Sequence, residues 1–79
     1  MNTSTTDTVY GHILLMEERL QRALAATTEA RDAMRRREAN LAIGTLLPMQ
    51  EHVTDVDTLL KSIFVLHRHA SRPRQGGAA

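Results

Sequence analysis

The chain has no cysteine and no tryptophan, and only Tyr10 and Phe64 of its 79 residues are aromatic. The absence of cysteine excludes disulfides and the zinc sites that cysteines build. With so few aromatic residues, the hydrophobic 42% of the chain consists mainly of Leu, Ile, Val, Met and Ala. Because these residues form no alternating runs typical of strands, the composition predicts an all-α protein.

The sequence also lacks a strong net charge and a long apolar run. Its formal net charge of +1 is too small to steer the whole protein toward nucleic acid. The mostly apolar segment 41–49 is far shorter than the roughly 20 residues of a membrane-spanning helix. Residues 1–12 have no basic region followed by an apolar stretch, as a secretory signal would. We therefore predict a cytoplasmic protein that does not enter a membrane.

Apolar residues recur at alternating steps of three and four in two stretches, as they do in a helix that packs against another helix. The first series is Ile13, Met16, Leu20, Ala23, Thr27, Ala30 and Met34. The second series is Met49, Val53, Val56, Leu60, Ile63 and His67. The two series are out of phase, because the first would continue to residue 48 rather than 49. The sequence therefore predicts two long helices that form an antiparallel hairpin.

We place the turn of the hairpin at residues 44–47. Gly44 is the strongest helix stop in the chain, and Pro48 suits the first turn of a following helix. The expected elements are a flexible N-terminal cap region over 1–7, a helix over about 8–43, a helix over about 48–70 and a disordered tail over 71–79. Ser4 or Asp7 is expected to cap the first helix, because its side chain can accept a bond from a free backbone N–H.

A turn near residues 38–40, with Asn40 as the cap, is the alternative. A turn at 44–47 leaves the start of the first helix overhanging the second by about 12 residues, or roughly 18 Å. A turn near 38–40 brings Ile13 opposite Val65 and closes the hairpin on itself. Both turn positions leave more apolar surface than the contact between the two helices can bury. We therefore expect two hairpins to dimerise into a four-helix bundle, or one hairpin to dock on another protein.

The predicted function is a non-enzymatic protein–protein interaction module, regulatory or chaperone-like, that occludes a partner's surface. The predicted partner or dimer interface comprises Ile13, Leu14, Leu15, Met16, Leu20, Leu46, Leu47, Val56, Leu60, Ile63, Phe64 and Leu66. We expect no catalytic residue, no cofactor and no small-molecule substrate. The serines have no apparent base beside them, and the chain has no glycine-rich phosphate loop.

An alternative function is that of a dimeric helical bundle binding RNA or DNA. Its candidate residues are Arg31, Arg35, Arg36 and Arg37. Arg31 and Arg35 share a helix face and could contact phosphates. However, acidic residues are interleaved with the arginines, and no aromatic platform is available for stacking bases. The sequence therefore favours a solvated helix face over a nucleic-acid site.

A further alternative is a metal-binding bundle built from histidines and carboxylates. Glu51, His52 and Asp55 lie within about one helical turn of each other. The Glu-x-x-His motif of di-metal bundles does not occur in the chain. His67 and His69 are two residues apart, so their side chains diverge on a helix. We therefore predict no metal ligand.

Overall fold

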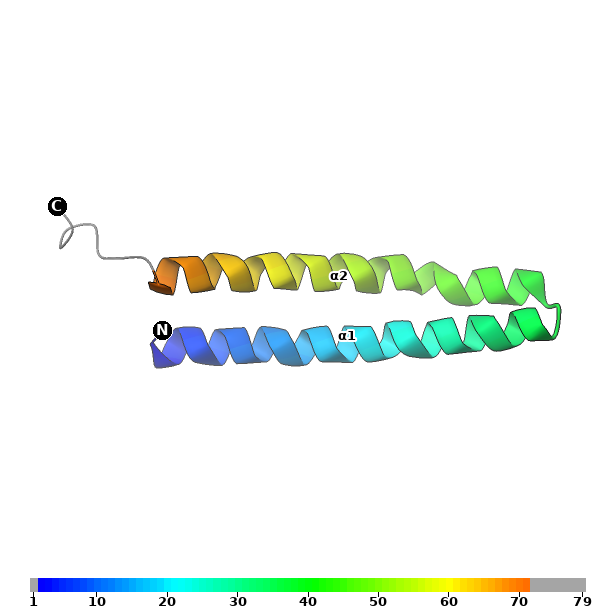
Figure 1. Cartoon of the computed structure of the whole chain (residues 1–79), viewed down its shortest axis with the longest axis horizontal. Coiled ribbons are helices and arrows are strands. Elements are labelled where there is room, and N and C mark those ends of the chain that lie inside the picture. Colours follow the sequence, from blue (N-terminus) through cyan, green and yellow to red (C-terminus); the bar gives the residue numbers. More distant parts are fainter. Residues whose placement is uncertain (1, 72–79) are drawn as a thin grey trace.

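The computed structural model describes residues 2–71, which form two helices (Figure 1). Helix α1 spans Thr3–Arg35 and helix α2 spans Ala39–Ser71, each with 33 residues. The helices lie side by side and run in opposite directions (Figure 1). This confirms the prediction of an all-α helical hairpin. Within residues 2–71, neither helix is long and apolar enough to cross a membrane.

Helix α1 begins five residues earlier than predicted. Asn2 is its N-cap, and the Asn2 side chain accepts a hydrogen bond from the Thr5 N–H at 2.7 Å. The Thr8 hydroxyl donates to the Ser4 carbonyl at 3.0 Å. The prediction of a flexible region over 1–7 was therefore wrong for residues 3–7, and so was the predicted cap at Ser4 or Asp7; residue 1 lies outside the described residues. Asparagine is among the best N-cap residues, and a threonine inside a helix can bond back to the preceding turn.

The turn comprises residues 36–38, so the predicted turn at 44–47 was wrong. Helix α1 ends in a Schellman motif, in which the Glu38 N–H donates to the Ala33 carbonyl and the Arg37 N–H donates to the Met34 carbonyl, both at 2.9 Å. Arg37 has a φ of 60°, the left-handed conformation that glycine usually supplies at this position. For an arginine this conformation costs roughly 1–2 kcal/mol. The hairpin therefore turns without a glycine.

Gly44 and Pro48 instead lie inside α2, where both weaken the helix locally. A glycine costs about 1 kcal/mol relative to alanine, and Pro48 lacks the N–H that would donate to the Gly44 carbonyl. The observed turn gives two helices of equal length, so the predicted overhang of about 12 residues does not exist. Helix packing along the whole length outweighs these local costs. The alternative prediction placed the turn at 38–40, two residues after the observed turn. Its expected cap, Asn40, lies inside α2 instead of capping it.

The C-terminal boundary of the hairpin also differs slightly from the prediction. Helix α2 continues to Ser71, one residue beyond the expected end. The remainder of the predicted disordered tail, residues 72–79, lies outside the described residues.

The buried core of residues 2–71 consists of alanine. Ala23, Ala30, Ala33 and Ala42 are 1–8% exposed, and no large side chain in this part of the chain is fully buried. Ala30, Ala33 and Ala42 form one cluster beside the turn, with Leu46 packed against it. The absence of bulky side chains there lets the two helix backbones approach closely. The core therefore contributes close contact but little buried apolar area.

Two contacts across the seam define how the helices are aligned. Arg19 Nε lies 3.5 Å from Asp55 Oδ2, and Thr27 Oγ1 lies 3.4 Å from Met49 Sδ. The residue numbers in these pairs add up to 74 and to 76, so residues whose numbers add up to about 75 lie at the same height. This alignment extends over the whole hairpin, because both helices have the same length.

Replacing Gly44 with alanine is expected to raise the free energy of unfolding by about 0.5–1 kcal/mol, because glycine inside a helix is destabilising. Gly44 has no positive φ, and a Cβ there would meet nothing within 4 Å. Gly11 in α1 meets the same two conditions, so Gly11→Ala is the matched control and should give a similar gain. Urea unfolding at a fixed protein concentration measures both changes. A loss of stability in Gly44→Ala alone would indicate a turn at residue 44 and contradict this fold.

Replacing Ala33 with leucine is expected to destabilise the hairpin by about 1–3 kcal/mol, because an overpacked contact forces the helices apart. Ala33 is 1% exposed and belongs to the alanine cluster. Ala25 is exposed on the same helix, and Ala25→Leu should have little effect because both residues are strong helix formers. The comparison uses the same urea measurement. Equal stability of the two variants would show that the helices do not meet at Ala33.

Candidate interaction surface

The side chains between the two helices follow a seven-residue repeat, in which every member is buried or partly buried. In α1 the repeat comprises Val9, His12, Met16, Arg19, Ala23, Ala26, Ala30 and Ala33. In α2 it comprises Ala42, Thr45, Met49, His52, Val56, Leu59, Ile63 and Leu66. Three predicted stripe positions in α1, Met16, Ala23 and Ala30, lie in this seam. Ile13, Leu20, Thr27 and Met34 lie one position outside it and are exposed.

These outer positions form an apolar face on one side of the hairpin. We define the apolar face as Tyr10, Ile13, Leu20, Leu24, Thr27 and Met34 of α1 with Ile43, Leu46, Val53, Leu60 and Phe64 of α2. The seven-residue spacing of these residues places them on the same side of both helices. Contacts support this placement, because Thr27 and Met34 line one groove together with Ile43 and Leu46.

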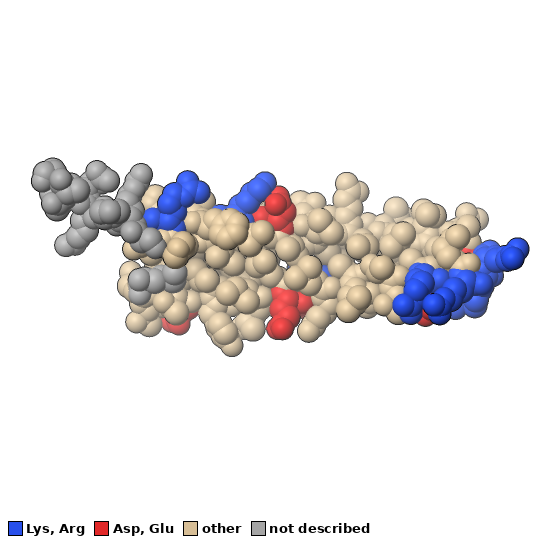
Figure 2. Space-filling model, in the orientation of Figure 1, with Lys and Arg blue, Asp and Glu red and all other residues tan. Residues whose placement is uncertain are grey.

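A second groove runs along α1 toward the N-terminus and is lined by Ile13, Met16, Leu20 and Leu24. Glu17 is the acidic residue in this groove. On α2, Asp57 lies at the edge of the apolar face and forms an ion pair with Lys61 at 2.9 Å. Figure 2 shows a side of the hairpin on which uncharged side chains cover most of both helices. Charge is therefore sparse on this surface between the two ends.

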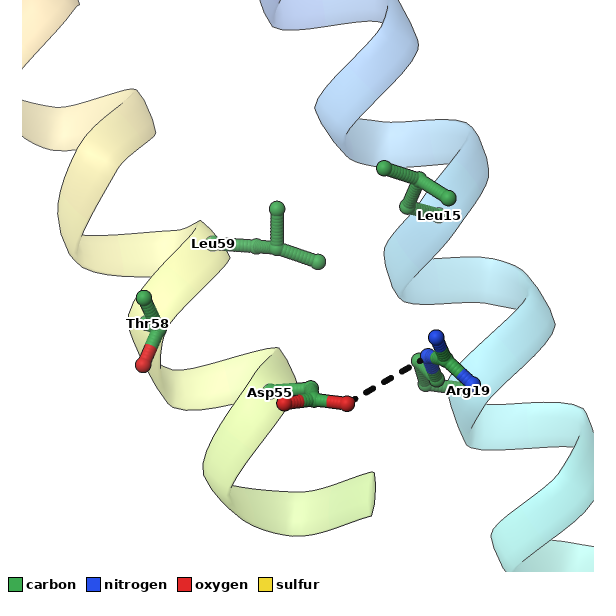
Figure 3. Close-up of a pocket in the computed structure, with 5 residues that line it drawn as sticks. All are labelled: Leu15, Arg19, Asp55, Thr58 and Leu59. Atoms are coloured by element: carbon green, nitrogen blue, oxygen red, sulfur yellow. Dashed lines mark ion pairs between the residues drawn. The ribbon is translucent and has the colours of Figure 1, made fainter. Parts of the chain in front are cut away.

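The opposite side of the hairpin carries two of the five ion pairs in the part of the chain that the structure describes, including the one that joins the helices. Figure 3 shows Arg19 of α1 and Asp55 of α2 pointing toward one another, with Leu15 and Leu59 beside them. Among the described residues, this is the ion pair that joins the two helices. Arg22 pairs with Glu18 at 2.9 Å within α1. We call this side the ion-paired side.

The structure divides the predicted interface among four locations. Ile13, Leu20, Leu46, Leu60 and Phe64 belong to the apolar face. The partly buried residues Met16, Val56, Ile63 and Leu66 belong to the seam. Leu15 lies on the ion-paired side, while the positions of Leu14 and Leu47 in the repeat place them on the outside of the hairpin. The predicted set is therefore not a single surface.

Sequence reasoning missed five large, exposed apolar members of the apolar face as interface residues: Tyr10, Leu24, Met34, Ile43 and Val53. The sequence does contain a pattern that indicates two of these residues. Tyr10 and Leu24 continue a seven-residue spacing that also contains Glu17 and Arg31, whose charges hide the pattern.

The four candidate arginines are gathered at the turn. Figure 2 shows basic side chains clustered at this end of the molecule. Arg31 Nε lies 3.4 Å from Asp32 Oδ1, and Arg36 Nε donates to Glu38 Oε1 at 2.6 Å. The hydrogen bond to Glu38, together with its negative charge, raises the pKa of Arg36 above its ordinary value. Two of the four arginines therefore already have carboxylate partners.

The structure does not assemble the metal alternative. Within residues 2–71, no group of three or more His, Cys, Asp or Glu residues is placed to hold a metal ion. Asp55 is paired with Arg19, and Glu51 is exposed. His52 lies in the seam, where its Nδ1 is buried without a hydrogen-bond partner among the described residues. His67 and His69 are exposed.

No family model, no curated protein and no solved structure matches this chain. The functional proposals below therefore depend on the geometry of the hairpin.

Proposed function

We propose that the chain is a non-enzymatic interaction protein that covers a partner's surface, in a regulatory or chaperone-like role. The distribution of apolar side chains supports this proposal. Tyr10, Ile13, Leu20, Leu24, Met34, Ile43, Val53 and Phe64 are all 49–67% exposed and share the apolar face. Single exposed apolar residues are ordinary, but a contiguous group on one side of a small protein is typical of an interaction site.

The hairpin also leaves many of its large apolar side chains outside the alanine core. Among the described residues, the buried ones are four alanines, whereas the apolar face carries leucine, isoleucine, valine, methionine and aromatic side chains. Burying one large apolar side chain contributes about 1.5–3 kcal/mol. Association through the apolar face would therefore add to the stability that the seam contacts provide. Helices of another protein or a second hairpin, which would complete a four-helix bundle, can supply the covering surface.

Site-specific photocrosslinking in the native host tests this proposal. A benzophenone amino acid at Leu24, which is 67% exposed on the apolar face, should form a defined protein adduct. The same group at Leu47 is the matched control, because Leu47 is 72% exposed but lies on the outside of α2. A covered apolar face predicts a strong adduct at residue 24 and little at residue 47. Identical adduct patterns at the two positions, or no adduct at residue 24, would overturn the proposal.

Binding of RNA or DNA is a second candidate function, supported by the grouping of four arginines at the turn (Figure 2). Arg35 and Arg37 lie near the end of the hairpin, where a phosphate backbone could approach. The carboxylate partners of Arg31 and Arg36 weaken this candidate, since they compete with phosphate. It therefore ranks below the protein interaction.

A gel-shift titration at low and moderate salt tests the second candidate. Nucleic-acid binding predicts an affinity that falls steeply with salt, because contacts between arginine and phosphate release counterions. Arg35→Gln combined with Arg37→Gln should then weaken binding at least tenfold, whereas Arg22→Gln, in the middle of α1, should not. If no shift occurs at low salt, this candidate is excluded.

A further inference from the structure

We propose that a second copy of this chain covers the apolar face in an antiparallel arrangement. The turn of each hairpin would then lie over the chain ends of the other, and the four helices would form one bundle. This inference rests on the proposed function, because it identifies the partner of the same surface.

The size of the apolar face suits a second copy. Its eight most exposed large side chains retain 49–67% of their accessible surface. At roughly 150–200 Å² for a fully accessible large side chain, the lower part of the range for aromatic residues, they present on the order of 700–900 Å². A stable protein–protein interface buries about 800 Å² on each partner. The face also extends along both helices, as expected for a surface that packs against an identical pair of helices.

Two hairpins related by a two-fold axis can stack on this face in two ways. In the parallel arrangement, the turns lie together and α1 packs on α2 of the second copy. Residues at the same height then meet, so Glu17 lies opposite Asp57 of the second copy, since 17 and 57 add up to 74. The symmetry repeats this contact between two carboxylates. Like charges placed opposite each other in an interface repel, so the parallel arrangement is disfavoured relative to one that separates them.

In the antiparallel arrangement, α1 packs on α1 and α2 packs on α2. An axis near Leu20 and Val53 places each of these residues opposite its own copy. Because 20 and 53 add up to 73, the two residues lie at nearly the same height, and one axis serves both helix pairs. The alignment derived from Arg19–Asp55 and Thr27–Met49 therefore permits this symmetry.

The same axis produces favourable pairs along the rest of the apolar face. Ile43 lies opposite Phe64 of the second copy, and Leu46 lies opposite Leu60. At the edge of the face, Tyr10 lies opposite Arg31, where an arginine can stack on the aromatic ring. These pairings place no two like charges together. The separation of like charges and the matching of apolar side chains therefore favour the same arrangement.

The edge residues that opposed each other in the parallel arrangement are separated here. Glu17 lies opposite Leu24 of the second copy, at a margin where its carboxylate can reach water. Asp57 lies opposite Gln50, whose amide can donate a hydrogen bond to it.

Single-cysteine crosslinking tests both the partner and the direction. The sequence has no cysteine, so a single introduced cysteine is the one thiol that can react with the crosslinker. With a short bifunctional maleimide, Leu20→Cys and Val53→Cys should each give a covalent dimer by itself. Leu14→Cys is the control, because Leu14 lies on the outside of α1 and is 47% exposed. This variant should give at least tenfold less covalent dimer. A parallel dimer would instead crosslink only when Leu20→Cys and Val53→Cys chains are mixed, which would overturn the proposed direction.

Light scattering of the unmodified protein at micromolar concentration should give twice the chain mass. Leu20→Glu combined with Leu24→Glu should give the mass of one chain, while Leu14→Glu combined with Leu47→Glu, of similar exposure, should keep the doubled mass. Circular dichroism verifies that the variants remain helical. Equal masses for the two double variants would overturn the inference.

The outcomes for this inference and for the proposed function can be told apart. A monomeric natural protein that still binds an apolar dye and forms the adduct at residue 24 would overturn the dimer and leave the proposed function standing. A monomeric protein that neither binds the dye nor forms the adduct would overturn both the dimer and the proposed function.

Discussion

The close alanine contact beside the turn determines much of the hairpin's surface. Ala30, Ala33 and Ala42 let the helix backbones approach where they are joined, and their small side chains bury little area. Because bulky residues are absent from that contact, the large apolar side chains lie at other helix positions. The alanine core and the exposed apolar face are therefore two consequences of one packing arrangement.

The two sides of the hairpin serve different purposes. On the ion-paired side, Arg19 and Asp55 join the helices and fix their alignment (Figure 3). On the apolar face, only Glu17 and a few other polar residues interrupt the apolar side chains. An ion pair at the surface contributes at most about 1 kcal/mol, so its value here lies more in specifying the alignment than in stability. The apolar face has the larger capacity for stabilisation, which only a second surface can use.

Much of the fold could be predicted from the sequence, because seven-residue spacing directly reflects helix packing. The position of the turn could not be predicted. Helix stop signals such as Gly44 act over a few residues, whereas the pairing of the two helices involves their whole length. Gly44 is a strong stop by itself, yet keeping it inside α2 lets both helices pair along their whole length. Nothing in the residue type of Arg37 indicates a left-handed conformation. Its hydrogen bonds, formed only once α1 ends there, stabilise it.

The candidate surface was predicted less well, for a different reason. Two overlapping repeats run along α1, one containing His12 and Arg19 and the other containing Ile13 and Leu20. The second is more apolar, so hydrophobicity alone assigns it to the inside of the hairpin. The structure places the first repeat in the seam and leaves the second on the apolar face. Hydrophobicity identified apolar positions, but it could not say which of them face the other helix of the hairpin and which are exposed.

The position of the alanine cluster also has a consequence for the order of folding. Only residues 34–41 separate Ala33 from Ala42, so the loop that this contact closes is very short. Short loops lose little entropy on closing, and contacts near in sequence form quickly. The hairpin should therefore close from the turn outward, and the segments around Ile13 and Phe64 should pair last. Newly made chains would therefore keep these segments accessible longest.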